Sequence, residues 1–100
     1  MIFAEMKYPE HYSDFHAELF AFISRNFSKV DGGLQGDSWI WIFDGEEKVA
    51  IDTFTSMKHQ IKSPMAGLHL QKVINLLQRR YEINVYDEPE FEGHENKPSA

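Results

Sequence analysis

The residues best suited to acid/base or metal chemistry in this sequence are its five histidines. Imidazole titrates near neutral pH and is a common metal ligand, so a histidine cluster indicates a catalytic or metal site. None of them shows His-x-x-x-His spacing, and His11 and His16 lie roughly 140° apart around a helix. The pair that a fold could bring together is His59 and His69, with Ser63 in the turn between them. These three residues form a candidate ligand pocket, against the simpler interpretation of ordinary, partly exposed histidines.

Motifs for catalysis and for cofactors are absent from the sequence. There is no cysteine, which excludes disulfides and thiol catalysis, and there is no Gly-x-Ser-x-Gly motif. The glycines of residues 32–36 do not form a dinucleotide-binding motif. The residues after Ser63 offer helix amides that suit an anion, but every capped helix has this property. We therefore expect no catalytic residue, no metal ion and no cofactor, and the sequence favours a non-enzyme over an enzyme.

A second candidate site is a row of aromatic residues at alternate positions, Trp39, Trp41 and Phe43. Contiguous exposed aromatic side chains on a protein surface typically mark a binding or dimer interface. Lys48 and Phe54, further along the chain, extend this surface if the two segments pair as strands. The competing interpretation is that the monomer covers these rings itself. The outcome depends on the strands that carry them.

Residues 38–54 predict the hairpin that positions this row. Two segments rich in β-branched and aromatic residues flank Asp44-Gly45, which is a strong hairpin signal. If the loop has an even length, either Asp44-Gly45 alone or residues 44–47, the aliphatic and aromatic side chains occupy opposite faces. An odd loop would place Val49 and Ile51 with the tryptophans. We favour the even loop because it keeps Lys48 off the packed face. The aliphatic face then consists of Ile40, Ile42, Val49 and Ile51.

The remaining sequence predicts the other elements of a two-layer fold. Alternating apolar residues predict strands at 2–8, 57–62 and 82–87, the first at an edge of the sheet. Helical spacing predicts helices over 9–27 and 63–80, the second capped by Ser63. Residues 28–37 are rich in turn residues, and the pattern does not decide whether a short strand forms between Val30 and Leu34. The expected fold is α+β: a two-layer sandwich of a mostly antiparallel sheet with two helices on one face, in the order β-α-β-β-β-α-β.

Length and charge limit the domain organisation and the function classes. The 100 residues suit a single domain, residues 1–87, followed by an acidic tail, residues 88–100, that is poor in aliphatic residues and expected to be mobile. A net charge of -6 argues against binding to nucleic acids or to anionic membranes. No apolar segment approaches the roughly 20 residues of a membrane helix, and the first residues do not resemble a secretory signal. We expect a cytoplasmic protein.

The leading hypothesis is a non-catalytic protein-binding or regulatory module that uses the aromatic row. Its partner would be another protein or a second copy of the chain in a homodimer. One alternative is a small ligand-binding domain or enzyme with a pocket near His59 and His69. The other alternative is an immunity or inhibitor protein for a basic partner, because an acidic surface favours association with a basic one.

Overall fold

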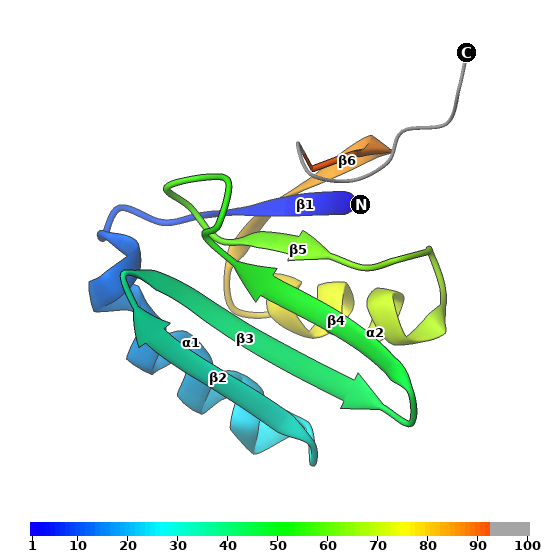
Figure 1. Ribbon diagram of the computed structural model, residues 1–100, viewed down its shortest axis with the longest axis horizontal. Helices are drawn as coiled ribbons and strands as arrows, with labels where there is room; N and C mark the ends of the chain where they lie inside the picture. Colours follow the sequence, from blue (N-terminus) through cyan, green and yellow to red (C-terminus); the bar gives the residue numbers. More distant parts are fainter. Residues whose placement is uncertain (93–100) are drawn as a thin grey trace.

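The computed structural model describes residues 1–92, which form one sheet of six strands and two α-helices. The strands follow the order β2-β3-β4-β5-β1-β6 in the sheet, and all neighbouring pairs are antiparallel. Figure 1 shows that α1 and α2 lie on the same side of this sheet. The predicted α+β fold and the order of its elements are confirmed, with β2 as an additional strand. The elements are β1 (Ile2–Lys7), α1 (Tyr12–Asn26), β2 (Val30–Gln35), β3 (Asp37–Asp44), β4 (Glu47–Asp52), β5 (Gln60–Lys62), α2 (Leu68–Gln78) and β6 (Glu82–Glu90).

The register of the β3–β4 hairpin determines which residues face the helices. Trp41 lies opposite Ala50, and Asp44 lies opposite Glu47, which leaves a two-residue loop that begins at Gly45. Gly45 has a φ of +59°, a conformation that glycine adopts without steric cost, and glycine at this loop position is typical of a type II′ turn. The predicted even loop is confirmed, in the register of the longer alternative, residues 44–47. The aromatic row and the aliphatic residues therefore occupy opposite faces.

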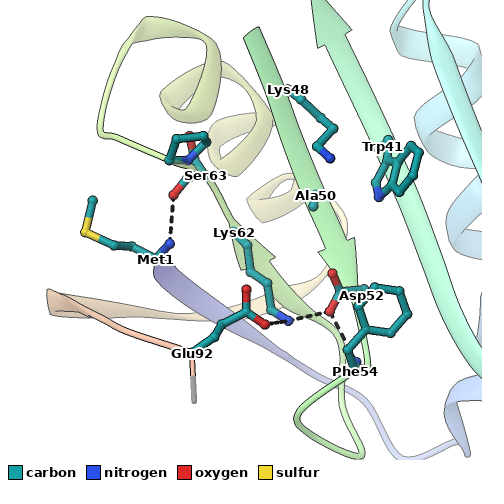
Figure 2. A pocket seen from close by; sticks show the side chains of 10 residues that line it. Met1, Trp41, Lys48, Ala50, Asp52, Phe54, Lys62, Ser63 and Glu92 are labelled. Atoms are coloured by element: carbon teal, nitrogen blue, oxygen red, sulfur yellow. Dashed lines mark hydrogen bonds and ion pairs between the residues drawn. The ribbon is translucent and has the colours of Figure 1, made fainter. Parts of the chain in front are cut away.

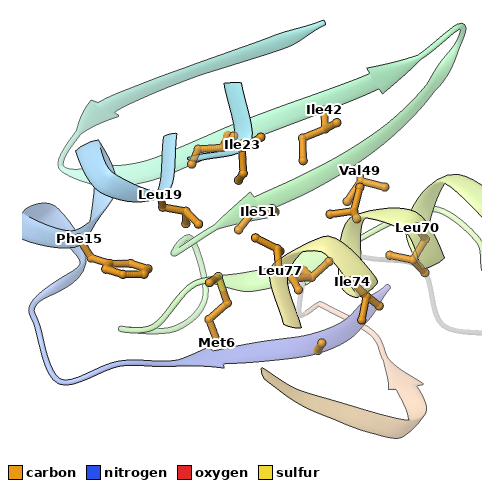
Figure 3. Packing of buried hydrophobic residues seen from close by; sticks show 14 residues of the cluster. Met6, Phe15, Leu19, Ile23, Ile42, Val49, Ile51, Leu70, Ile74 and Leu77 are labelled. Atoms are coloured by element: carbon orange, nitrogen blue, oxygen red, sulfur yellow. The ribbon is translucent and has the colours of Figure 1, made fainter. Parts of the chain in front are cut away.

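The aliphatic face of the sheet and the apolar stripes of both helices form one core (Figure 3). Removing these side chains from water is the main favourable contribution to folding. All of them are at most 5% exposed. The principal core residues are Ala4, Met6, Phe15, Leu19, Ile23, Ile40, Ile42, Val49, Ile51, Ile61, Leu70, Val73, Ile74 and Leu77.

Strand β2 can form at this sheet edge because two of its residues are glycines. A Cβ atom at Gly32 would lie 2.6 Å from the Phe20 ring of α1, and one at Gly33 would lie 2.8 Å from the indole Nε1 of Trp39. Real Cβ contacts are longer, so each aromatic ring occupies the space that a side chain on β2 would need. Helix α1 therefore packs closely on one face of β2, and Trp39 packs on the other.

Both helices begin later than predicted. Helix α1 begins at Tyr12, after the proline that was expected in its first turn. Helix α2 begins at Leu68, and Ser63 does not cap it, because the Ser63 hydroxyl donates a hydrogen bond to the Met65 carbonyl at 2.8 Å. Residues 63–67 thus form a loop beside β4. Neither helix of the described chain has the length and apolar character needed to span a membrane.

The edges of the sheet also differ from the prediction. Strand β1 lies inside the sheet, because β6 pairs along its outer side, so β2 and β6 are the edges. Strand β6 continues to Glu90 rather than ending at Asp87, so the predicted tail contains the end of this strand. The part of the tail at residues 93–100 lies outside the described residues.

Candidate functional site

The aromatic row lies on the open face of the sheet, which is the face opposite the helices. The ring centroids of Trp39 and Trp41 are 4.5 Å apart, and the Phe43 ring stands nearly perpendicular to Trp41 at 6.5 Å. The Lys48 Nζ lies 4.3 Å from the centre of the Trp41 ring, within the range of a cation–π contact. All four side chains remain partly exposed. The row is therefore a continuous aromatic surface whose members partly cover one another.

A pocket of about 360 Å³ opens on this face beside Trp41 (Figure 2). Ala50 lies opposite Trp41 on the neighbouring strand, and its small side chain leaves space between larger neighbours. Phe54, which is 50% exposed, and Lys48 also line the pocket. Three of the five residues predicted to bind a partner therefore line this pocket. The other two predicted residues, Trp39 and Phe43, lie on either side of Trp41 in the aromatic row.

The polar end of this pocket is a buried network of three charged residues. The Lys62 ammonium lies 2.5 Å from the Asp52 carboxylate and 2.5 Å from the Glu92 carboxylate. These three side chains are only 5%, 4% and 11% exposed, respectively. Burial raises the pKa of Asp52, while its hydrogen bond to Lys62 opposes that shift. The Lys62 ammonium is thus paired inside the protein, and the surface that the pocket exposes is mainly apolar.

Sequence reasoning named none of these three residues as part of the open-face site. The alternation in residues 57–62 already places Lys62 on the face away from Ile61, so its position on the open face had a sequence signal. Glu92 had none, because it lies in a segment that was interpreted as a mobile tail. Ser63 and Pro64 line the edge of the pocket. The prediction had placed Ser63 at the start of the second helix instead.

His59 belongs to a buried chain of hydrogen bonds on the other side of the sheet. Its Nδ1 lies 2.6 Å from the Tyr8 hydroxyl, and its Nε2 lies 2.7 Å from the Ser38 hydroxyl. The Ser38 hydroxyl lies 2.6 Å from Nδ1 of His16 on α1. The backbone N–H of His59 also donates to the Tyr8 oxygen, at 3.1 Å. Both ring nitrogens of His59 are therefore hydrogen-bonded, one to Tyr8 and one to Ser38.

Burial shifts the protonation equilibria along this chain toward the neutral forms. It lowers the pKa of His59 to about 4, with a smaller effect from the charge on His16, and it also lowers the pKa of His16. Burial raises the pKa of Tyr8 to about 12. A serine between two imidazoles resembles an activated nucleophile, but Ser38 is completely buried, so no substrate reaches it. The chain connects the residue after β1, α1, β3 and the residue before β5.

His69 lies apart from His59. Its Nε2–H donates to the carbonyl oxygen of Ile42 at 2.9 Å, and its ring stands at 85° to that of Phe27. It lines a second pocket, of about 390 Å³, between the hairpin loop, the start of α2 and the loop at Ser63. This space exists because β5 is shorter than the predicted strand 57–62 and pairs only with the second half of β4. Ser63 and His69 therefore share a pocket, and His59 is not part of it.

The geometry leaves two candidate binding surfaces, the open-face pocket at Trp41 and the pocket at His69. Within residues 1–92, no three histidine or carboxylate side chains are grouped closely enough to hold a metal ion. Comparison with protein-family models, with curated protein sequences and with solved structures found no significant match to this chain.

Proposed function

We propose that the chain is a non-catalytic binding module that holds a partner protein on the open face of its sheet. The observation that carries this proposal is the pocket beside Trp41, on a face that neither helix covers. Phe54 stands at its rim, half exposed, and Ala50 provides its depth. Aromatic residues that surround a concave, mainly apolar site are typical of binding surfaces.

The chemistry of the pocket favours an apolar side chain of the partner as the group that enters it. Trp41, Phe54 and Ala50 offer apolar surface, whereas the Lys62 ammonium is already paired. Burying 100 Å² of apolar surface contributes roughly 2.5 kcal/mol. Lys48 at the rim can contact a polar or acidic residue next to the inserted side chain.

A selection from a random peptide library displayed on phage tests this proposal, with Ala50→Leu as the informative variant. Leucine at this position fills the pocket without removing an aromatic residue. The exposed residue Leu68 does not line the open-face pocket, so Leu68→Ser is the control. Selected peptides should carry an aromatic or branched apolar residue and should bind Ala50→Leu at least about tenfold more weakly than wild type, a loss of about 1.4 kcal/mol.

Binding to the Leu68→Ser variant should match that to wild type. Peptides that bind Ala50→Leu as tightly as wild type would show that the pocket is not the site. The net charge of -6 supports a basic surface around the partner's apolar group, as in an inhibitor of a basic protein. The association rate of the selected peptides should then fall as salt is added, and an unchanged rate would exclude this electrostatic component.

A second candidate function, binding of a small ligand, is supported by the pocket at His69. Because the ring hydrogen on Nε2 is donated to Ile42, Nδ1 of the neutral ring is the nitrogen that can accept a hydrogen bond. A small, mainly apolar molecule with one hydrogen-bond donor suits this pocket. An NMR screen of such fragments should shift the signals of His69 and Gly67. A screen that leaves both signals unchanged contradicts this second function.

A further inference from the structure

The two edges of the sheet differ in their protection against pairing with another strand. Strand β6 carries acidic residues along its length and a proline at Pro89, and its register with β1 is irregular, all features that disfavour edge pairing. Strand β2 has neither lysine nor proline, and it pairs with β3 without irregularity over all its residues. Asp31 is the one charged residue of this strand, so its outer edge is less protected against strand addition than that of β6.

The hydrogen bonds of β2 identify the backbone groups at this outer edge. The carbonyl of Lys29 accepts the N–H of Phe43 on β3 at 2.9 Å, so Lys29 is directed toward β3. Because backbone groups alternate along an antiparallel strand, Asp31 and Gly33 are also directed toward β3. The N–H of Gly32 donates to the Asp31 carboxylate at 2.9 Å rather than to β3, as expected for a group on the outer side of the strand. The residues with outward-directed backbone groups are Val30, Gly32 and Leu34.

We propose that β2 pairs antiparallel with β2 of a second copy of this chain, about a two-fold axis at Gly32. The register that pairs all the outward-directed residues places Gly32 opposite its own copy and Val30 opposite Leu34. Leu34, which is 42% exposed, then packs against Val30 of the second copy. Asp31 lies opposite Gly33, so no two like charges face each other directly. The edge is thus complementary to itself in side chains as well as in hydrogen bonds.

Helix α1 contacts both β2 and β3, so it lies near the edge that pairs. The two-fold axis then places the two copies of α1 on the same side of the joined sheets, next to each other. Phe20 lies over Gly32, and the residues one turn away on that side, Ala17 and Ser24, are exposed and small. They allow the two helices to approach.

One contact of the monomer opposes the pairing. The Asp31 carboxylate holds the Gly32 N–H, which must be released to bond the second copy. A neutral amide is a weaker acceptor than a carboxylate, so Asp31→Asn should lower the dissociation constant of the dimer. This variant also removes two negative charges near the axis.

Light scattering over a range of concentrations tests the proposal on the full chain. Wild type should approach twice the chain mass of 11.7 kDa as the concentration rises. Leu34→Lys removes the apolar pair and places a charge at the edge, so it should raise the dissociation constant about tenfold or more. Leu68→Lys is the matched control, because Leu68 is 81% exposed at the start of α2, away from β2. Circular dichroism verifies that both variants are folded.

Hydrogen exchange identifies the edge that pairs. In the dimer the amides of Val30 and Leu34 should exchange slowly and should become fast on dilution, whereas Asp31 and Gly33 should exchange slowly at every concentration. A chain that stays monomeric at all concentrations, a Leu34→Lys variant that dimerises like wild type, or a dimer in which the Val30 and Leu34 amides remain fast would each overturn the proposal. Ala50→Leu should dimerise normally, so this test is independent of the open-face pocket.

Discussion

At the scale of single residues, His59 is held neutral by the groups around its ring. Nδ1 is hydrogen-bonded to Tyr8 and Nε2 to Ser38, so both ring nitrogens are occupied. A charged ring would have no contact with water, because the His59 side chain is completely buried. Burial first, and the charge on His16 second, lower the pKa of His59 to about 4.

The free energy of unfolding should therefore decrease as the pH falls from 6.5 to about 4. Over this range the unfolded chain binds a proton at His59, with a pKa of 6.5, which the folded chain binds only near pH 4. Since the unfolded state binds more protons, acid favours it, by roughly 3 kcal/mol in total for this residue. Urea denaturation at a series of pH values should show a smaller slope for His59→Gln than for wild type. His11→Gln is the control, and equal slopes for wild type and His59→Gln would contradict this account.

The Lys62 network should respond strongly to loss of the Lys62 ammonium. Lys62→Met leaves Asp52 and Glu92 buried without this counter-charge, so we expect a loss of about 3 to 5 kcal/mol in the free energy of unfolding. Adding Asp52→Asn and Glu92→Gln to the same chain should restore part of that stability, because the buried charges are then removed. Urea denaturation measures both variants. A Lys62→Met protein as stable as wild type would show that the network is solvated.

At the scale of the elements, the hairpin could be predicted because its signal is local. Alternation over residues 38–54 places aliphatic and aromatic side chains on opposite faces, and Gly45 marks the loop. Two other elements depend on distant contacts. The sequence of β2 is typical of turns because of its glycines. The strand depends on Phe20 and Trp39, which fill the space beside these glycines in the fold. Ser63 appears to cap a helix, but it pairs with Met1: the Ser63 N–H donates to the Met1 carbonyl at 3.0 Å.

The two glycines of β2 should tolerate alanine differently. At Gly32 the added carbon would meet the Phe20 ring and also the backbone carbonyl of Trp39 at 2.9 Å, which cannot move freely. At Gly33 the three nearest atoms all belong to the indole ring of Trp39, which is a side chain. We expect Gly32→Ala to lower the free energy of unfolding by about 1 to 3 kcal/mol and Gly33→Ala by less, with a change in tryptophan fluorescence only in the latter. The reverse order of stabilities would contradict the packing described for β2.

At the scale of the whole molecule, the folded domain extends beyond the predicted boundary at Asp87. The end of β6 and the Glu92 carboxylate both lie against the rest of the sheet. A chain that ends at Asp87 should therefore unfold about 1 to 3 kcal/mol more easily than a chain that ends at Glu92, because it leaves Lys62 with one carboxylate fewer. Thermal and urea denaturation of the two chains measure the difference. Equal stabilities would show that the folded domain ends at Asp87.

The candidate site was predictable to the extent that it depends on one hairpin. Trp41 and Lys48 face the same pocket because alternation fixes their side of the sheet. The histidine hypothesis needed long-range information, because Tyr8 and Ser38, distant from His59 in sequence, are its actual partners. Local patterns give the face of a strand, and they do not give the neighbours that the fold brings to it.

The most direct test of the open-face proposal is an NMR titration of the labelled protein with the tightest peptide from the phage selection. We predict that the indole N–H of Trp41 and the backbone amides of Ala50 and Phe54 shift, while the amides of Gly67 and His69 do not. Shifts confined to Gly67 and His69 would move the binding site to the second pocket. Either that result or a spectrum in which Trp41 and Ala50 stay unchanged at saturation would contradict the account.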